Sequence, residues 1–426
     1  MAFLTLEDPN AKIKGYRDPL GTLPIWVSFG RHVVTNLTLA SSTVRGFTTH
    51  MLGRYFSGRL IKSERIPSDE AMNVFFRNEQ LCAYIRHHAH GVTGSIRGIE
   101  RVRKNLADGK GKVTIQTDRH GWILSDQKVY GLWGLYTVSS RASGFLPNET
   151  FGLTPLAEQF VEDFYGAALK PSLAALERLL VRGGRYHVKK NDKIYQSLAT
   201  ILNPNFQPEE IDFYGKYLRD AEAVPGTTPG RQARLVRYLD ELEFLDSRTD
   251  RTQILTLAKR AKVEDQGLAT ALERIAILEA VLAPSDAIFQ YALTKHGQPV
   301  KELAKSLHQA WGKDVPHVDP QGFEKLIPEI VESSSQAEAK ALHKTAQALG
   351  EGDYEEAVNA IMEWNAAVTA SRKGAAWLVR KSGRIDVRYK GGDRALPSGD
   401  ALPQLWRNPY FLSSLKSVTR ELNQAA

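Results

Sequence analysis

The chain is poor in cysteine and lacks long apolar runs. Its 426 residues contain one cysteine, Cys82, which excludes an internal disulfide and a cysteine-rich zinc site. So few cysteines are typical of a reducing compartment, and we expect a cytoplasmic location. No apolar run reaches the roughly 18–20 residues needed to cross a bilayer, and the acidic start of the chain does not fit a signal peptide. We therefore expect a soluble protein without a membrane partner.

Common catalytic motifs are also missing. The sequence has no GxxxxGK[ST] phosphate loop, no GxGxxG after a predicted strand and no GxSxG elbow. Asp386 in "RIDVRYK" lacks the spacing of a PD-(D/E)xK nuclease. We predict no catalytic residues, no cofactor and a protein that is not an enzyme. An enzyme whose site joins distant residues stays open as an alternative, because catalytic groups meet in space rather than in sequence.

The histidine cluster "RHHAH" (Arg86–His90) is the one place where a metal site could be sought. His87 and His90 are three residues apart, a spacing that can bring two imidazoles to one ion. A zinc site normally needs three or four protein ligands, and no HExxH or CxxC motif is near. We predict no metal site here.

Positive charge is concentrated in the first third of the chain. The net charge is +8, and residues 77–145 alone hold eleven Lys and Arg against five Asp and Glu. Residues 146–426 are close to neutral, with 36 Lys and Arg against 37 Asp and Glu. A concentrated positive field attracts a polyanion, and nucleic acid is the most common one.

Apolar residues recur mostly at three- and four-residue steps, so the pattern predicts a mainly α fold with short β pieces. We expect an N-terminal helical segment (1–67), a winged-helix-like domain (68–170), a helical connector (171–233), an α-helical domain (234–380) and a C-terminal strand and helix (381–426). The segment "APSD" (283–286) is expected to be a loop, and "KVTIQT" (112–117) a strand.

The winged-helix expectation comes from the order of predicted elements between residues 78 and 165. Two helices, a short strand, a helix over 125–142 and a turn-rich hairpin over 143–153 follow one another, and "FGLTPLAEQFVEDF" completes the series. This order resembles winged-helix accessory subunits of bacterial anti-phage defence systems and of SMC-like complexes with kleisin-type subunits. The resemblance implies that the helix over 125–142 enters the major groove of double-stranded DNA.

Candidate DNA contacts follow from this interpretation. On the 125–142 helix they are Gln127, Lys128, Ser139, Ser140 and Arg141, since Gln can read adenine and Arg can read guanine. Around it, we expect phosphate contacts from Arg97, Arg101, Lys104, Lys110, Lys112 and Arg119.

A second basic stretch runs from Arg372 to Arg394, with eight Lys and Arg against two Asp. Trp377 and Tyr389 lie among these charges, so they could stack on a base; the alternative is a basic edge strand that resists aggregation.

Taken together, the sequence predicts a non-enzymatic DNA-associated subunit of a larger prokaryotic assembly. Its helical C-terminal part would bind other protein subunits. A protein scaffold without DNA contact is the alternative.

Overall fold

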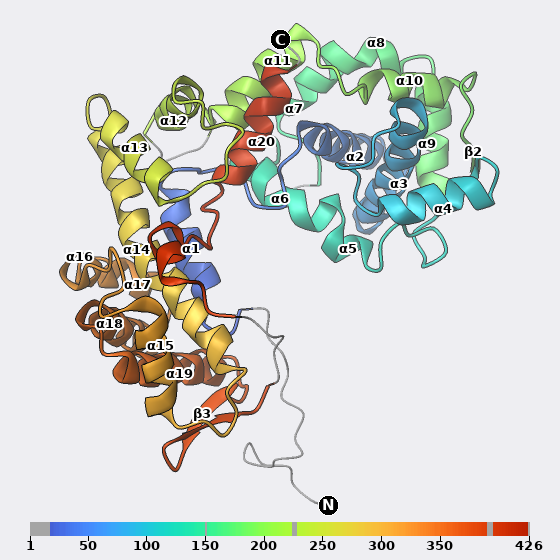
Figure 1. The fold of residues 1–426 in the computed structure, drawn as a ribbon. Coiled ribbons are helices and arrows are strands. Elements are labelled where there is room, and N and C mark those ends of the chain that lie inside the picture. The colour runs from blue at the N-terminus through green and yellow to red at the C-terminus, as the bar shows by residue number, and fades with distance from the viewer. Residues whose placement is uncertain (1–17, 150, 224–227, 390–394, 425–426) are drawn as a thin grey trace, which may run out of the picture. The chain divides into compact units, whose positions relative to one another are not determined.

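The computed structural model describes residues 18–149, 151–223, 228–389 and 395–424. Its composition, 62% helix and 4% strand, confirms the mainly α prediction. The two small sheets are antiparallel pairs: β1 (Lys112–Ile115) with β2 (Gly184–His187), and β3 (Leu378–Lys381) with β4 (Arg384–Val387). Figure 1 labels one strand of each pair, β2 and β3. Within the described ranges, none of the helices combines the length and apolar character that crossing a bilayer requires.

The chain forms two compact units, and each is built from two separate stretches. Among the described residues, unit 1 comprises those within 1–33 and 247–410, and unit 2 comprises those within 34–246 and 411–426. The chain therefore leaves unit 1 early, completes most of unit 2, returns to unit 1 and adds its last helix to unit 2. This division differs from the five consecutive segments expected from sequence.

Unit 2 is organised around two long helices. In α2 (Val44–Lys62) and α3 (Ala71–His90), most side chains are buried. Figure 1 shows both helices among the shorter helices of unit 2. These are α4 (Ile99–Asp108), α5 (Gln127–Tyr130), α6 (Leu132–Ala142), α7 (Pro155–Phe160), α8 (Gly166–Leu169), α9 (Leu173–Arg182), α10 (Lys193–Ile201), α11 (Pro208–Tyr214), α12 (Arg231–Glu241) and α20 (Leu412–Asn423).

A buried ion pair connects α2 to α11 in this unit. Arg45 binds both carboxylate oxygens of Glu210, and it also donates to the backbone carbonyls of Asn203 and Asn205. The Tyr165 hydroxyl donates to the same carboxylate at 2.6 Å. Because both charged groups have several hydrogen-bond partners, their removal from water is largely compensated.

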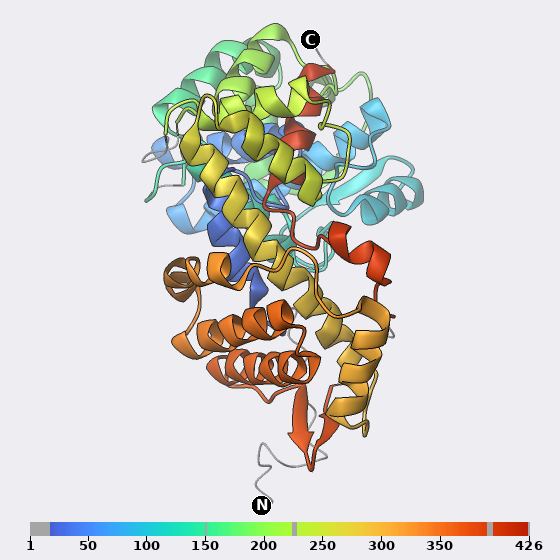
Figure 2. The same ribbon diagram turned by 60° about the vertical axis from the view of Figure 1, so that its left-hand side comes forward.

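Unit 1 is organised around α14 (Gln266–Ala292), which is apolar on most sides and packs against α1 (Thr22–Arg31), α13 (Arg251–Ala261) and α19 (Tyr354–Ser371). The expected loop at 283–286 is wrong, because Pro284 is buried inside α14. A proline inside a helix removes one backbone hydrogen bond, and burial of the surrounding apolar residues outweighs that loss here. The other helices, visible in Figure 2, are α15 (Val300–Trp311), α16 (Pro320–Glu324), α17 (Ile327–Ser333) and α18 (Gln336–Glu351).

Candidate nucleic-acid interface

A two-stranded ribbon brings together two basic segments of unit 2 that are about 70 residues apart in the sequence. In the β1–β2 pair, Lys112 lies opposite His187, and Thr114 lies opposite Arg185. The two strands can approach this closely because Gly183, just before β2, has no side chain. A Cβ atom on Gly183 would lie 2.6 Å from the carbonyl oxygen of Ile115. Gly183 also has a φ of 65°, which glycine adopts without strain.

The ribbon has a buried face and a polar face, as strand alternation requires. Val113, Ile115 and Tyr186 are buried and anchor the ribbon to unit 2. The Tyr186 hydroxyl donates to Asp192 at 2.6 Å. The same carboxylate caps α10 by accepting from the backbone N–H of Tyr195 at 3.1 Å. The connection from β2 to α10 is thus held at both ends.

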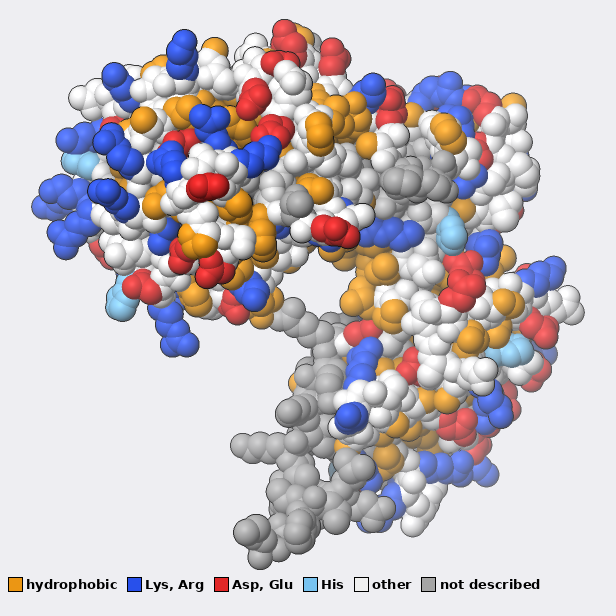
Figure 3. All heavy atoms as spheres, turned by 180° about the vertical axis from the view of Figure 1, so that it is seen from behind, with side chains coloured by type: hydrophobic (Ala, Val, Ile, Leu, Met, Phe, Trp, Pro, Cys, Tyr) orange, Lys and Arg blue, Asp and Glu red, His pale blue; other side chains and the backbone are white. Residues whose placement is uncertain are grey.

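Ten exposed cations surround this ribbon, and we call them the basic surface. Within residues 101–112 and 182–193 they face only two acids, Asp108 and Asp192, so these two segments carry a net charge of +8. Figure 3 shows Lys and Arg side chains gathered at the left-hand edge, over the part of unit 2 that carries α4, β1 and β2. The ten are Arg101, Arg103, Lys104, Lys110, Lys112, Arg182, Arg185, Lys189, Lys190 and Lys193.

These cations are poorly neutralised by the protein itself. Of the ten, only Arg103 lies within 4 Å of a carboxylate in the described part of the chain, that of Glu100 at 3.9 Å. Arg101 donates to the backbone carbonyls of Trp122 and Leu124, which positions the side chain without cancelling its charge. The like charges of these side chains therefore repel one another, and a bound polyanion would reduce that repulsion.

Two histidines at this surface respond to the surrounding charge. Partial desolvation, followed by Lys189 and Lys112, lowers the pKa of His187 below its ordinary value. Desolvation, followed by Lys190 and His87, likewise lowers the pKa of His88. The lowered pKa values favour the neutral form of both imidazoles.

The structure brings four predicted contacts into the basic surface: Arg101, Lys104, Lys110 and Lys112. The other exposed candidates are spread over different elements. Arg119 lies in the turn after β1, Lys128 is on α5 and Arg141 is on α6. Arg97 is exposed in the loop before α4, where its guanidinium donates to the carbonyl oxygen of Ala40 at 3.1 Å.

The prediction for the remaining polar candidates is corrected, because Gln127, Ser139 and Ser140 are fully buried. The Gln127 amide donates to the carbonyl oxygen of Phe76 at 3.0 Å and to the Glu79 carboxylate at 2.8 Å. Ser139 shares a hydrogen bond with Ser41, and Ser140 shares one with His50. These side chains hold α5 and α6 to unit 2 and are not available to base edges.

The winged-helix arrangement over residues 78–165 is not confirmed. The expected recognition helix is two helices, α5 and α6, separated at Gly131. β1 pairs with β2 and not with the segment 143–153, and the described residues of that segment form no strand. Residue 150 lies outside the described residues.

Sequence reasoning missed the second half of the basic surface, which is Arg182, Arg185, Lys189, Lys190 and Lys193. The run "RGGRYHVKKNDK" (182–193) holds five cations against one acid. This local excess of positive charge predicts a basic surface, but it does not appear in the net charge of residues 146–426, which are close to neutral as a whole.

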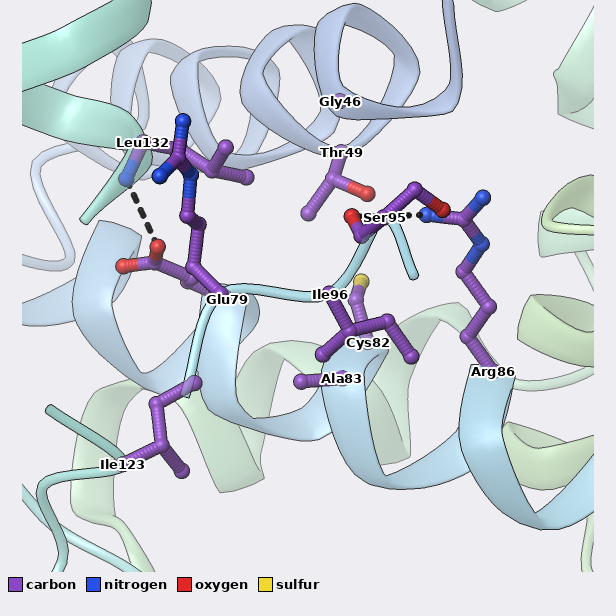
Figure 4. A pocket seen from close by; sticks show the side chains of 11 residues that line it. Gly46, Thr49, Glu79, Cys82, Ala83, Arg86, Ser95, Ile96, Ile123 and Leu132 are labelled. Atoms are coloured by element: carbon purple, nitrogen blue, oxygen red, sulfur yellow. Dashed lines mark hydrogen bonds between the residues drawn. The ribbon is translucent and has the colours of Figure 1, made fainter. Parts of the chain in front are cut away.

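A small pocket lies beside the start of α6, shown in Figure 4. It is large enough for about two water molecules. On one side Glu79 accepts from the backbone N–H of Leu132 at 2.7 Å, and burial raises the pKa of this carboxyl to about 7. On the other side burial lowers the pKa of Arg86 to about 10. The pocket is too small for a nucleotide, so we do not assign it to the interface.

The three clustered histidines each have a different partner. His87 shares a hydrogen bond with the carbonyl oxygen of Val92, His88 with the Tyr195 hydroxyl and His90 with the carbonyl oxygen of Ala199. Within the described ranges, no group of three or more His, Cys, Asp or Glu side chains could hold a metal ion. The cluster joins the end of α3 to neighbouring elements.

Comparison with known proteins gives no relative: no protein-family model, curated protein or solved structure matches this chain.

Proposed function

We propose that this chain is a non-enzymatic subunit of a larger prokaryotic assembly that holds double-stranded DNA on the basic surface of unit 2. The observation that carries the proposal is the set of ten exposed cations in two segments that hold only two acids and that the β1–β2 ribbon joins. Lys and Arg side chains that neutralise phosphates release counterions from the duplex, and this release favours binding.

The proposed binding is independent of base sequence. Reading of bases needs hydrogen-bonding side chains that reach the groove edges, whereas cations at the backbone only position the duplex. Of the predicted base readers, Gln127 is buried, and the exposed Arg141 lies on α6, outside the basic surface. The proposal therefore assigns contact to phosphates and does not depend on a winged helix.

The assembly itself is proposed from the resemblance described above, to accessory subunits of anti-phage or SMC-like complexes. In that setting the helical C-terminal part of the chain binds other protein subunits.

A protein-binding role is the second candidate, and the outward face of α5 and α6 favours it. Val129 is 50% exposed, Tyr130 42% and Val138 58%. Large apolar side chains with such exposure occur at protein-binding surfaces as well as singly on ordinary surfaces. A scaffold without DNA contact would use this face and leave the basic surface without a ligand.

The test is the affinity of the full-length protein for a fluorescein-labelled duplex of random sequence, measured by fluorescence anisotropy at several salt concentrations. The variant Lys112→Ala/Lys190→Ala removes two cations of the basic surface. The control Lys170→Ala/Lys340→Ala removes two exposed lysines outside it. The proposal expects binding that weakens at least tenfold in the first variant and is unchanged in the control. Equal affinities for both variants, or no binding by the wild type at low salt, would overturn it.

A further inference from the structure

The β3–β4 hairpin of unit 1 is short and cationic. Its two turn residues, Ser382 and Gly383, have φ values of 50° and 75°, the left-handed pair that closes a two-residue hairpin with the natural strand twist. Lys381 lies opposite Arg384 directly at this turn. Figures 1 and 2 both show the hairpin extending from the end of unit 1, past the helices.

The base of the hairpin is anchored. Leu378, Ile385 and Val387 are buried. The other edge of β4 is covered by the segment 297–299, since the N–H of Ile385 donates to the carbonyl oxygen of Gln298 at 2.9 Å and that of Gly297 donates to Ile385 at 2.7 Å. The ribbon is therefore held in one orientation, and its tip needs little ordering on binding.

Cations dominate the exposed side chains of the hairpin. Arg380, Lys381 and Arg384 are exposed, whereas the carboxylate of Asp386 lies 3.6 Å from Arg388 and is thereby occupied. The Arg384 guanidinium donates to the carbonyl oxygen of Gly297 at 2.9 Å, an interaction that orients its charge without neutralising it. Lys301, at the start of α15, adds another exposed cation next to the tip, because the N–H of Val300 donates to Gly383 at 3.1 Å.

We infer that this hairpin is a second contact for duplex nucleic acid, with its exposed cations lying against the phosphate backbone. The identity of the ligand rests on the proposed function, whereas the site is argued from residues of unit 1 alone. Because the segment 297–300 already covers the β4 edge, the contact is made by the exposed cations and not by a bare ribbon that enters a groove.

The duplex is favoured over a single strand because Trp377 offers no open ring face. Single-strand binding relies on open aromatic faces for stacking. Trp377 is 6% exposed and stacks on Tyr389 at 3.9 Å between ring centroids, so the expected base-stacking role of Trp377 has no open face to use.

The test uses full-length protein and the same labelled duplex, with the variant Lys381→Ala/Arg384→Ala and the control Lys170→Ala/Lys340→Ala. Loss of two phosphate contacts should reduce the magnitude of the slope of log affinity against log salt by about 1.8, since each contact contributes about 0.9. Binding should weaken about tenfold or more at low salt, while thermal unfolding matches that of the control.

The outcomes separate this inference from the proposed function. If the hairpin variant matches the control while Lys112→Ala/Lys190→Ala loses affinity, the hairpin contact is wrong and the basic surface stands. If only the hairpin variant loses affinity, the hairpin contact stands and the basic surface is wrong. Stronger binding of the wild type to a single strand than to the duplex would also overturn the inference.

Discussion

Lys112 on β1 lies directly opposite His187 on β2, so the ribbon sets a permanent cation beside a titratable imidazole. Together with Lys189, this neighbour lowers the pKa of His187, after the larger effect of desolvation. Protonation of His187 at low pH would therefore add positive charge to the basic surface.

Affinity for duplex DNA should rise as pH falls from 7.5 to 5.5. In the free protein the lowered pKa values of His187 and His88 favour the neutral imidazoles. Bound phosphates would raise these pKa values, so binding takes up protons and is favoured by acid. We expect a higher affinity at pH 5.5 than at pH 7.5, because proton uptake on binding makes the affinity rise as the proton concentration rises. Anisotropy titrations at constant ionic strength measure it.

The matched variants for this pH effect are His88→Gln/His187→Gln and, as a control in unit 1, His308→Gln. The first should flatten the pH profile without much change at pH 7.5, and the control should follow the wild type. If the affinity of the double variant still rose steeply as pH falls, other titratable groups would have to cause the pH dependence.

Glu79 should make unit 2 less stable as pH rises. Burial raises its folded-state pKa from an ordinary value of 4.5 to about 7, so the folded state binds the proton more tightly than the unfolded chain does. Its stabilising contribution is fully present below about pH 4.5, falls as pH rises through the interval to about 7, and stays constant above it. The cost is about 2–3 kcal/mol between pH 5 and 8, at 1.36 kcal/mol per pKa unit.

Urea unfolding of wild type and Glu79→Gln at several pH values isolates this effect, because other carboxyls cancel in the difference. The wild type should lose stability relative to the variant by that amount between pH 5 and 8. A constant difference would mean that Glu79 titrates normally in the folded protein.

Breaking the Arg45–Glu210 pair should destabilise the protein by about 3–5 kcal/mol, because the remaining charge is left buried without its partner. Arg45→Met is the direct test, measured by urea unfolding. The double variant Arg45→Met/Glu210→Leu should lose clearly less than the sum of the two single variants, since neither charge then remains. Additive losses would show that the pair is not coupled.

A larger side chain at Gly53 should destabilise the protein, because α2 packs closely against α3 at this residue. A Cβ atom there would lie 2.5 Å from the ring of Phe75, so Gly53→Ala should cost about 1–3 kcal/mol of unfolding free energy. Gly166→Ala is the matched control, because no atom lies within 4 Å of its Cβ position. Similar stabilities for the two variants would mean that α2 and α3 separate readily.

The sequence predicted the helical class and the basic character of residues 97–119, because both follow from local composition. It did not predict that β1 pairs with β2, since that partner is distant and the strands are only four residues long. Gln127 shows the other limit. As a polar residue on a helix it was expected at the surface, yet the buried carboxylate of Glu79 needs a donor and Gln127 supplies one at 2.8 Å. A hydrogen bond of this kind cannot be predicted from sequence until it is known which helices pack against each other.

Lysine acetylation footprinting of the wild-type protein, with and without saturating duplex DNA, tests the basic surface most directly. Mass spectrometry would give the reactivity of each lysine. The account predicts that bound DNA protects Lys104, Lys110, Lys112, Lys189 and Lys190, whereas Lys170 and Lys340 react as before. Unchanged reactivity of those five lysines while the duplex is bound would contradict it.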